Sequence, residues 1–470
     1  MNSNKTTRLI LILTIISILF CACKKPESSI AININLNQHT EISEPTIDEK
    51  PDNHEFIRQM LAKDLIKNPE ITEIFGEKEL VDFIDWLADK YDIEVLYTLA
   101  GEASDGKLIN NAFHSLTGFG LHTLYDSYSG HLDPKSENYM SNIYNLGKTD
   151  DGEAEFGFVG DVMFADNSSM MRKYNNLNKG ILSILDDRII DIMKSVDIMT
   201  ANNEFALSLR GSPINGKTYT FRASPSKADI WHEMGVDVVS LANNHVFDYG
   251  EDAFLDTLDT LDAAGIKRMG AGRNIDEAGK PVYYIINGYK IALLAATRAE
   301  KNIFTPEATE TSGGVMYTYD STKFCKEIKE AKAQSDFVII NVHWGYELTT
   351  QLETAQLTMG KEYIDSGADL IIGHHAHTLQ GIDSYKGKVI CYNLGNFLFN
   401  KKSVETGILI AKITSDGKLV SSFIPCYQQD IYTRLSMGEE FNNTINRLRS
   451  ISTNVDLSNT GIITPLTNEN

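Results

Sequence analysis

The sequence is poor in positive charge, and this shortage excludes one large class of partner. Its 470 residues hold 43 Lys and Arg against 64 Asp and Glu, so the formal net charge is -21. Binding to duplex nucleic acid needs a basic surface that neutralises phosphates, and we therefore expect no nucleic-acid partner. Gly and Pro, at 33 and 11, are too sparse for collagen-like or low-complexity segments. A hydrophobic content of 42% still permits a sizeable core, and the length suggests about three units of roughly 150 residues.

Familiar catalytic signatures are missing as well. The chain has neither a G-x-x-x-x-G-K-[ST] phosphate loop nor a G-x-S-x-G elbow. Residues 270–274 begin a dinucleotide-binding pattern, but Ile275 stands where its last glycine belongs. His232 and Glu233 begin an HExxH zinc motif, but Val236 stands in place of the second histidine. These incomplete patterns leave no support for a nucleotide fold or a zincin.

Cysteine is scarce, and two of the five cysteines lie together near the N-terminus. Cys21 and Cys23 follow the one strongly apolar run, residues 9–20, which itself follows two basic residues. A run of this length is too short to span a bilayer but suits a secretory signal. A small residue precedes Cys23, as in a bacterial lipobox, so we expect residues 1–22 to be a signal peptide and Cys23 to be lipidated. The protein would then be extracytoplasmic and lipid-anchored to the cell membrane or outer membrane; an ordinary secretory signal and an uncleaved anchor are the alternatives.

The other three cysteines, Cys325, Cys391 and Cys426, are widely spaced and form no zinc-knuckle pattern. Cys391 lies in an apolar run and is most simply a buried core thiol. One disulfide among the three is compatible with a place outside the cytoplasm, and the sequence leaves its pairing open.

The polar and apolar pattern divides the rest of the chain into segments. Residues 23–53 are rich in Asn, Ser and Glu and predict a flexible tether. Residues 54–150 predict a small, mainly helical region, because apolar residues recur every three or four positions around residues 80–87, and a polar connector follows from residue 131. Residues 431–470 become polar again and predict a C-terminal tail.

Between these segments, residues 151–430 alternate short apolar runs with helical stretches, which is typical of an α/β domain. The predicted strands are 155–160, 196–201, 236–242, 290–296, 336–342, 368–373 and 388–393. Residues 252–264 carry one apolar face and predict a helix. Residues 407–426 alternate around Asp416 and Gly417 and predict a late antiparallel hairpin.

Polar side chains follow five of these predicted strands at the point where each strand ends. They are Asp161; Asn202, Asn203 and Glu204; Asn243, Asn244 and His245; His343 and Glu347; and His374, His375 and His377. Because strand carboxyl ends form the ligand crevice of an open α/β sheet, we expect these side chains to converge. Imidazole, carboxylate and amide oxygen together suit one or two divalent ions of Zn, Mn or Fe. Such a pair activates a water and holds the attacking and leaving oxygens of a phosphoryl or acyl centre.

Each of these motifs also has a purely structural interpretation. The Gly160-Asp161 pair is a common turn, Asn243 and Asn244 suit a helix cap, and His343 is compatible with a buried core position. The three histidines within 374–377 are harder to explain structurally, because burying them is costly unless they bind a ligand or form hydrogen bonds. The motifs taken jointly therefore favour a metal site.

The order of these motifs resembles the CapA family, bacterial poly-γ-glutamate capsule synthesis proteins with a metallophosphoesterase-like, calcineurin-type fold. The motifs are GDVMF (160–164), ANNEF (201–205), LANNHVFDYG (241–250), GAGRN (270–274), HWGYE (343–347), GHHAH (373–377) and NLGNFLF (393–399). The resemblance covers roughly residues 155–400. It implies a layered α/β/β/α domain within residues 151–430.

The resemblance also implies a role for each polar residue. The metal ligands would be Asp161, Glu204, Asn244, His343, His375 and His377, with Glu204 bridging two ions. His245 would protonate a leaving group, and Asp248 would orient it. The supporting residues would be Asn202, Asn243, Glu347 and His374. One departure is Met163, which stands where metallophosphoesterases usually carry a histidine, so the number of bound ions stays open.

The function implied by the resemblance is synthesis, export or trimming of an anionic envelope polymer of the poly-γ-glutamate type. The protein would act at the membrane with a polymer synthesis complex and would carry a metal-dependent hydrolase site. Two alternatives stay open: a non-catalytic accessory subunit of such a complex, and a secreted metal-dependent phosphodiesterase unrelated to capsule.

Overall fold

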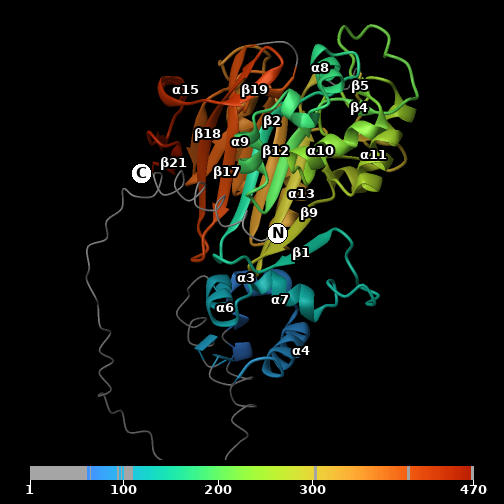
Figure 1. Ribbon diagram of the computed structural model, residues 1–470. Coiled ribbons are helices and arrows are strands. Elements are labelled where there is room, and N and C mark those ends of the chain that lie inside the picture. Colours follow the sequence, from blue (N-terminus) through green and yellow to red (C-terminus); the bar gives the residue numbers. More distant parts are fainter. Residues whose placement is uncertain are drawn as a thin grey trace, which may run out of the picture. The chain divides into compact units, whose positions relative to one another are not determined.

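The computed structural model of the chain is shown in Figure 1. It describes residues 61–63, 65–92, 95, 96, 98, 99, 109–300, 304–399 and 403–466. The chain divides into two compact units, Met1–Asn53 and His54–Asn470, and every described residue belongs to the second. The expected signal peptide, the tether and the lipidation site Cys23 lie outside the described residues. Across the described ranges, no helix has both the length and the apolar character needed to cross a membrane.

One of two large sheets has seven strands in the order β1-β9-β10-β12-β13-β15-β14. In that order the strands span Ile143–Gly147, Val282–Ile286, Tyr289–Thr297, Phe337–Trp344, Leu370–His375, Lys388–Cys391 and Ile382–Tyr385. The central strands β10, β12, β13 and β15 run parallel. Four strands predicted from continuous apolar runs are thereby confirmed, since strands covered on both faces carry apolar side chains on both sides.

The other sheet has ten strands, in the order β20-β21-β18-β17-β2-β3-β6-β7, with β16 beside β2 and β19 beside β18. In that order the first eight span Val455–Leu457, Ile462–Pro465, Leu419–Gln429, Val404–Ile413, Ala154–Val162, Ile198–Asn203, Val238–Ser240 and Lys267–Met269. β16 spans Asn396–Leu398 and β19 spans Tyr432–Leu435. The three remaining predicted strands are confirmed here, and β17 and β18 form the expected antiparallel hairpin.

Helices cover the outer face of each sheet (Figure 1), so the layers are α/β/β/α as expected. Helices α10 (Asp229–Met234) and α11 (Glu251–Ala264) share a core with the ten-stranded sheet. Helices α13 (Thr322–Lys332) and α14 (Thr354–Asp365) share another with the seven-stranded sheet. A third core lies between the two sheets. The strands that lead to the predicted site residues are therefore packed on both faces.

The remaining elements are short. They are α8 (Ser169–Leu177), α9 (Asp187–Met193), α12 (Ile275–Gly279), the 3-10 turns Gly180–Ser183 and Pro225–Ala228, and two small strand pairs, β4 (Ala206–Leu207) with β5 (Arg222–Ala223) and β8 (Ala271–Gly272) with β11 (Gly314–Val315). Among the described residues, Cys325, Cys391 and Cys426 are free thiols, and Cys391 lies in the core between the sheets as predicted.

The prediction of a polar tail over residues 431–470 is wrong for the described part, 431–466. This segment forms β19, α15 (Gly438–Ser450), β20 and β21, and three of these elements are strands of the ten-stranded sheet. Ile445 and Leu448 pack into the core between the sheets, together with Leu457 and Ile463. The segment is polar overall because each of its elements buries only a few side chains on one face, and most of the others are at least partly exposed to solvent.

The helical region contains α3 (Pro69–Ile74), α4 (Glu77–Ala88), α6 (Ile109–Thr117) and α7 (Leu121–Tyr128), which have a core of their own. The connector that follows contributes β1, which pairs with β9, where the sequence predicted only polar chain. The region holds the turn before β10: the Gly288 carbonyl accepts hydrogen bonds from the Gly120 N–H (2.8 Å) and the Thr123 hydroxyl (2.9 Å). Gly288 has φ +80°, and a Cβ there would lie 2.3 Å from the Gly118 carbonyl oxygen, so this turn requires glycine.

Candidate metal centre

The polar residues predicted at five strand ends meet where the two sheets face each other. Asp161 lies near the end of β2, next to Asn202 on β3 in the sheet register. Glu204 follows β3, and Asn244 follows β6. From the facing sheet, His343 on β12 and His374 on β13 lie side by side, and His375 ends β13. All of these side chains are buried.

Three acidic and imidazole groups make the tightest cluster. Asp161, Glu204 and His377 each place a candidate ligand atom within 4.8 Å of the others. The Nδ1 of His377 lies 3.0 Å from Asp161 Oδ2. The Asn202 amide donates to Asp161 Oδ1 (2.9 Å) and to Glu204 Oε1 (2.8 Å), so Asn202 holds the two carboxylates together.

A second pair of ligand atoms lies beside this cluster. His343 Nε2 and Asn244 Oδ1 are 2.9 Å apart. Neighbouring ligands of one ion held at about 2.1 Å lie about 3 Å apart, so this spacing suits a shared ion. His343 Nδ1 is 3.5 Å from Glu204 Oε1, and the His375 ring centroid is 4.7 Å from that of His343. Glu204 therefore lies between the two ligand sets, where a bridging carboxylate belongs.

Two atoms of the cluster are buried without a partner. Within the part of the chain that the structure describes, Glu204 Oε2 and His375 Nδ1 have no hydrogen-bond partner. A buried polar atom left unsatisfied costs about 1–3 kcal/mol, and more when it is charged. A divalent cation would satisfy both atoms, and the carboxylate, imidazole and amide donors match Zn, Mn or Fe. The residues present therefore fit a metal.

The pKa values of the two carboxylates are driven apart. Burial raises the pKa of Asp161, but the imidazoles of His374 and His377 outweigh it and hold the pKa well below its usual value. Burial and the neighbouring Asp161 raise the pKa of Glu204 well above its usual value, with a further contribution from Glu347. Two carboxylates this close repel each other when both are ionised, and a cation between them would relieve that repulsion.

Two histidines of the site, His343 and His375, are held neutral. Burial, followed by the charge of His375, places the pKa of His343 well below its usual value. Burial, followed by His377, lowers the pKa of His375 to about 3. Neutral imidazole is the form that binds a metal, so both rings are ready to act as ligands.

The backbone at this site is strained. His375 has φ +89° and His377 has φ +54°, in the left-handed region that non-glycine residues rarely adopt. Conformations of this kind cost of order 1–3 kcal/mol each and cluster at functional sites. The strained positions are those of two candidate ligands, His375 at the end of β13 and His377 just after it.

The expected pair His245 and Asp248 is present, and a cation that the sequence did not single out completes it. His245 Nδ1 lies 2.7 Å from Asp248 Oδ2, which also accepts the Phe221 N–H at 2.7 Å. Lys217 Nζ lies 2.9 Å from Asp248 Oδ1 and 2.9 Å from Glu300, and it donates to the Asn244 carbonyl. Lys217 lies in the loop between β4 and β5, and no sequence motif or apolar periodicity marks it as a site residue.

The supporting residues differ in how closely they approach the cluster. The side-chain oxygen Oδ1 of Asn243 accepts a hydrogen bond from the backbone N–H of His245 (3.0 Å), which stabilises the turn that carries His245. His374 Nδ1 lies 3.5 Å from Asp161 Oδ1, and its Nε2 lies 3.1 Å from Asn341 Oδ1. Glu347 is exposed and lies outside the cluster, although its charge reaches Glu204. Met163 packs into the core on the helix side, so this position supplies no imidazole.

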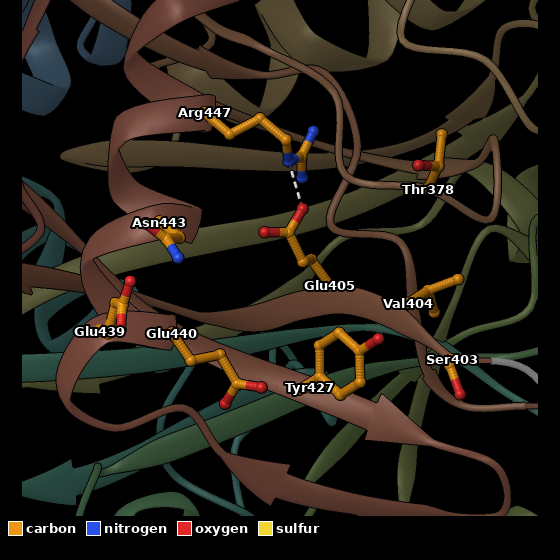
Figure 2. A pocket seen from close by; sticks show the side chains of 9 residues that line it. All are labelled: Thr378, Ser403, Val404, Glu405, Tyr427, Glu439, Glu440, Asn443 and Arg447. Carbon is orange, nitrogen blue, oxygen red and sulfur yellow. Dashed lines mark ion pairs between the residues drawn. The ribbon is translucent and has the colours of Figure 1, made fainter.

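A pocket of about 580 Å³ lies next to the strand end that carries His377 but does not contain the cluster (Figure 2). It is lined by Thr378, Ser403, Val404, Glu405, Tyr427, Glu439, Glu440, Asn443 and Arg447. Three of its four charged side chains are in ion pairs: Arg447 pairs with Glu405, and Glu440 with Arg434 at 2.6 Å. A pocket whose charges are mostly paired gives little chemical reason to place the reaction there.

The sequence of the chain matches a known protein family and several known proteins. A family model described as bacterial capsule synthesis protein PGA_cap matches residues 155–401, more than half of the chain. The chain belongs to the PGA_cap family. The resemblance to CapA proteins is thereby confirmed, and the α/β/β/α layers are those of the metallophosphoesterase-like PGA_cap fold. The matched residues include every member of the cluster.

Several curated relatives of this PGA_cap chain are capsule or polyglutamate proteins. The capsule biosynthesis protein CapA of Bacillus anthracis is 32% identical over 205 residues, which is 42% of this chain and 49% of that protein. The PGA biosynthesis protein CapA of Bacillus subtilis is 31% identical over 251 residues, 53% of this chain and 64% of that one. A probable polyglutamine synthesis accessory protein of Mycobacterium tuberculosis is 25% identical over 246 residues, 48% of this chain and 64% of that one. The chain thus spans 49–64% of the length of these relatives.

Proposed function

We propose that this PGA_cap protein is a metal-dependent hydrolase that acts on an anionic envelope polymer of the poly-γ-glutamate type. The observation that carries the proposal is the buried, unsatisfied cluster around Asp161 and Glu204, which a fold without a ligand has no reason to keep. The names of the CapA relatives support the polymer as the substrate class. A phosphoester is the other substrate class that the same site chemistry serves.

The proposal assigns the metal to the cluster already described. Its ligands are Asp161, Glu204, Asn244, His343, His375 and His377, and Mn, Zn or Fe suits them equally by donor type. When bound, such an ion lowers the pKa of a water and polarises the centre that the water attacks. Asn202 holds the carboxylates in place for it.

The chain's own residues supply the proton and the orientation. Asp248 occupies Nδ1 of His245, so Nε2 is the nitrogen that faces a substrate and gives its proton to the leaving atom. Lys217 and the Phe221 N–H fix Asp248, which keeps the ring from turning. His245 is 6% exposed, so the proton is delivered in a largely water-free place.

The overall charge bears on the substrate. A chain with a net charge of -21 repels a polyanion at long range. The bound cation would then be the local source of attraction for a carboxylate or phosphate, since Lys217 is already paired with Asp248 and Glu300. A short oligomer or a chain end suits such a site better than the middle of a long polymer.

A direct test compares the purified full-length chain with its His245→Ala variant, both supplied with Mn²⁺. Phosphodiester and γ-glutamyl oligomer substrates are assayed side by side. We expect wild-type turnover of one class and a loss of about 10²–10⁴-fold in the variant. His232→Ala, at an exposed histidine, is the matched control and keeps the wild-type rate. Undiminished activity in His245→Ala would remove His245 from the mechanism.

A second candidate is a non-catalytic accessory subunit of a polymer synthesis complex. Met163 favours it, because the position that usually gives a metallophosphoesterase a histidine is apolar and turned into the core. The Mycobacterium tuberculosis relative is itself named an accessory protein. Metal binding without turnover of either substrate class would favour this candidate over the hydrolase.

We also propose that the mature protein is extracytoplasmic and anchored by a lipid on Cys23. The support is the apolar run 9–20 and the small residue before Cys23. Mass spectrometry of the protein from membranes is expected to show a lipid-modified N-terminus at Cys23 in the wild type and an unprocessed chain in Cys23→Ala. Equal masses apart from the substitution would contradict the anchor.

A further inference from the structure

Asn396 is a buried amide with both ends unsatisfied. Its side chain is fully buried, and across the described residues neither Oδ1 nor Nδ2 has a hydrogen-bond partner. Both groups of a carboxamide bind strongly to water before folding, so burying them without partners is costly. Such a side chain in a well-packed core indicates a ligand that the protein chain does not itself provide.

The strand register places Asn396 beside the metal cluster. β16 runs parallel to β2, and Asn396 is the partner of Asp161. The two segments are in close contact, since the Asp161 N–H donates to the Gly395 carbonyl at 2.9 Å. A Cβ on Gly160 would lie 1.9 Å from that same carbonyl oxygen, so no side chain separates the strands here.

The neighbours of Asn396 and Asp161 show which way both side chains point. Val162 and its register partner Leu398 both belong to the core on the helix side of the ten-stranded sheet. Residues paired across neighbouring strands point to the same face, and Asp161 lies against His374 and His377, so Asn396 also points toward the seven-stranded sheet. This is the face on which His343 and His375 lie.

The ligand set of the cluster has room for one more donor. Metallophosphoesterases usually supply a histidine two residues after the first aspartate, and here Met163 is packed in the helix-side core. The first ion would be left with Asp161, Glu204 and His377. An amide oxygen is an ordinary ligand for Mn and for related divalent ions.

We propose that Asn396 is a further metal ligand, and that its Oδ1 takes the place in the first ion's ligand set that Met163 leaves vacant. The inference rests on the proposed metal site and deepens it, because it adds a residue of the 393–399 motif that had no predicted role. The remaining Nδ2 would then donate to an oxygen held at the same ion, so both ends of the amide are satisfied.

The proposal is tested by binding rather than by turnover. Mn²⁺ is titrated calorimetrically into the full-length wild type, Asn396→Leu and Asn396→Ser, and thermal unfolding is measured with and without Mn²⁺. We expect both variants to lose at least about tenfold in Mn²⁺ affinity, a loss that even residues behind the ligands produce. We also expect metal-free Asn396→Leu to melt no lower than wild type, because an apolar side chain of similar size replaces an unsatisfied amide.

The matched control is Asn142→Leu. The Asn142 amide donates to the Pro281 carbonyl at 2.9 Å, and its Oδ1 is likewise without a partner among the residues that the structure describes. Asn142 lies just before β1, the edge strand of the seven-stranded sheet, and outside the metal cluster. The Mn²⁺ affinity of Asn142→Leu should therefore equal that of wild type. Asn396→Ser shortens the side chain without adding apolar bulk and carries the test should Asn396→Leu fail to fold.

The outcomes separate this inference from the proposed function. Wild-type affinity in the Asn396 variants would overturn the ligand role of Asn396 and leave the metal site standing. A metal-free Asn396→Leu that melts well below wild type, with unchanged Mn²⁺ affinity, would make Asn396 a structural residue. A folded wild type that binds neither Mn²⁺ nor Zn²⁺ would overturn both the inference and the proposed function.

Discussion

Both ends of the seven-stranded sheet bury charge, but they do so in opposite ways. At the start of β10, Lys290 lies 2.6 Å from Asp126 of the helical region, and each side chain is 2% exposed. His131 lies 2.8 Å from the other oxygen of the same carboxylate. At the other end, His343 and His374 face Glu204 and Asp161 of the ten-stranded sheet, two carboxylates buried together without a buried cation between them in the described chain.

The difference shows which end the protein keeps for folding and which for binding. At the start of β10 the charges are opposite and paired, so they join the helical region to the sheet. At its end, where Thr297 pairs with His343, the charges are alike and two ligand atoms are unsatisfied. Buried like charges and unsatisfied polar atoms destabilise a fold, and where a protein keeps them they usually mark a functional site. The two ends should therefore respond to substitution with opposite signs.

The largest effect on stability is expected at the paired end. Asp126→Ala leaves Lys290 buried without its partner, and removing one member of a buried pair costs about 3–5 kcal/mol. Chemical denaturation should show this loss in the free energy of unfolding. Asp150→Ala, at an exposed carboxylate of the connector that follows the helical region, should change it by less than about 0.5 kcal/mol. An equally small effect of Asp126→Ala would erase the distinction between the two ends.

An intermediate effect is expected from pH at the unpaired end. The pKa of His375 is lowered to about 3 by burial and His377, while in the unfolded chain a histidine titrates near 6.5. Protons therefore bind the unfolded state first, so the metal-free protein loses stability as pH falls from 6.5 toward 3. The slope from this one group approaches about 1 kcal/mol per pH unit.

His375→Asn isolates that contribution. Between pH 6 and about 4.5, the unfolding free energy of the variant should fall less steeply with decreasing pH than that of wild type. The difference in slope should correspond to about one proton fewer taken up on unfolding. Parallel curves for the two proteins would mean that His375 is not held neutral by the fold.

The smallest effect is expected from neutralising one of the two like charges. Glu204→Gln removes the group whose pKa is raised by burial and by Asp161, so metal-free protein at pH 7 should gain stability. The same variant should bind Mn²⁺ less tightly, because one of the proposed ligands is lost. A loss of metal-free stability as large as that of Asp126→Ala would show that Glu204 serves the fold.

Much of the framework was predictable because buried parallel strands have a plain signature. Continuous apolar runs such as 336–342 and 368–373 end at His343 and His374, and strand carboxyl ends meet at one edge. The candidate ligands could therefore be named without a structure. Their convergence from two facing sheets, rather than along one, required the fold.

The residues that the sequence did not reveal are those whose role depends on tertiary contacts. Lys217 lies in an irregular loop and gains its role only where it meets Asp248 and Glu300. Asn396 stood in a quoted motif, but only the register with Asp161 places it at the cluster. The segment 431–466 looked like a tail because burying a few side chains per element leaves the composition polar.

The central claim is that the cluster around Asp161 is built for a metal. Its most direct test is elemental analysis of the full-length protein and of Asp161→Asn, each purified without chelator and confirmed as folded. The account predicts one or two equivalents of Mn, Zn or Fe in the wild type and a large loss in Asp161→Asn. A folded wild type that holds none of these metals, and takes up none when Mn²⁺ or Zn²⁺ is supplied, would contradict it.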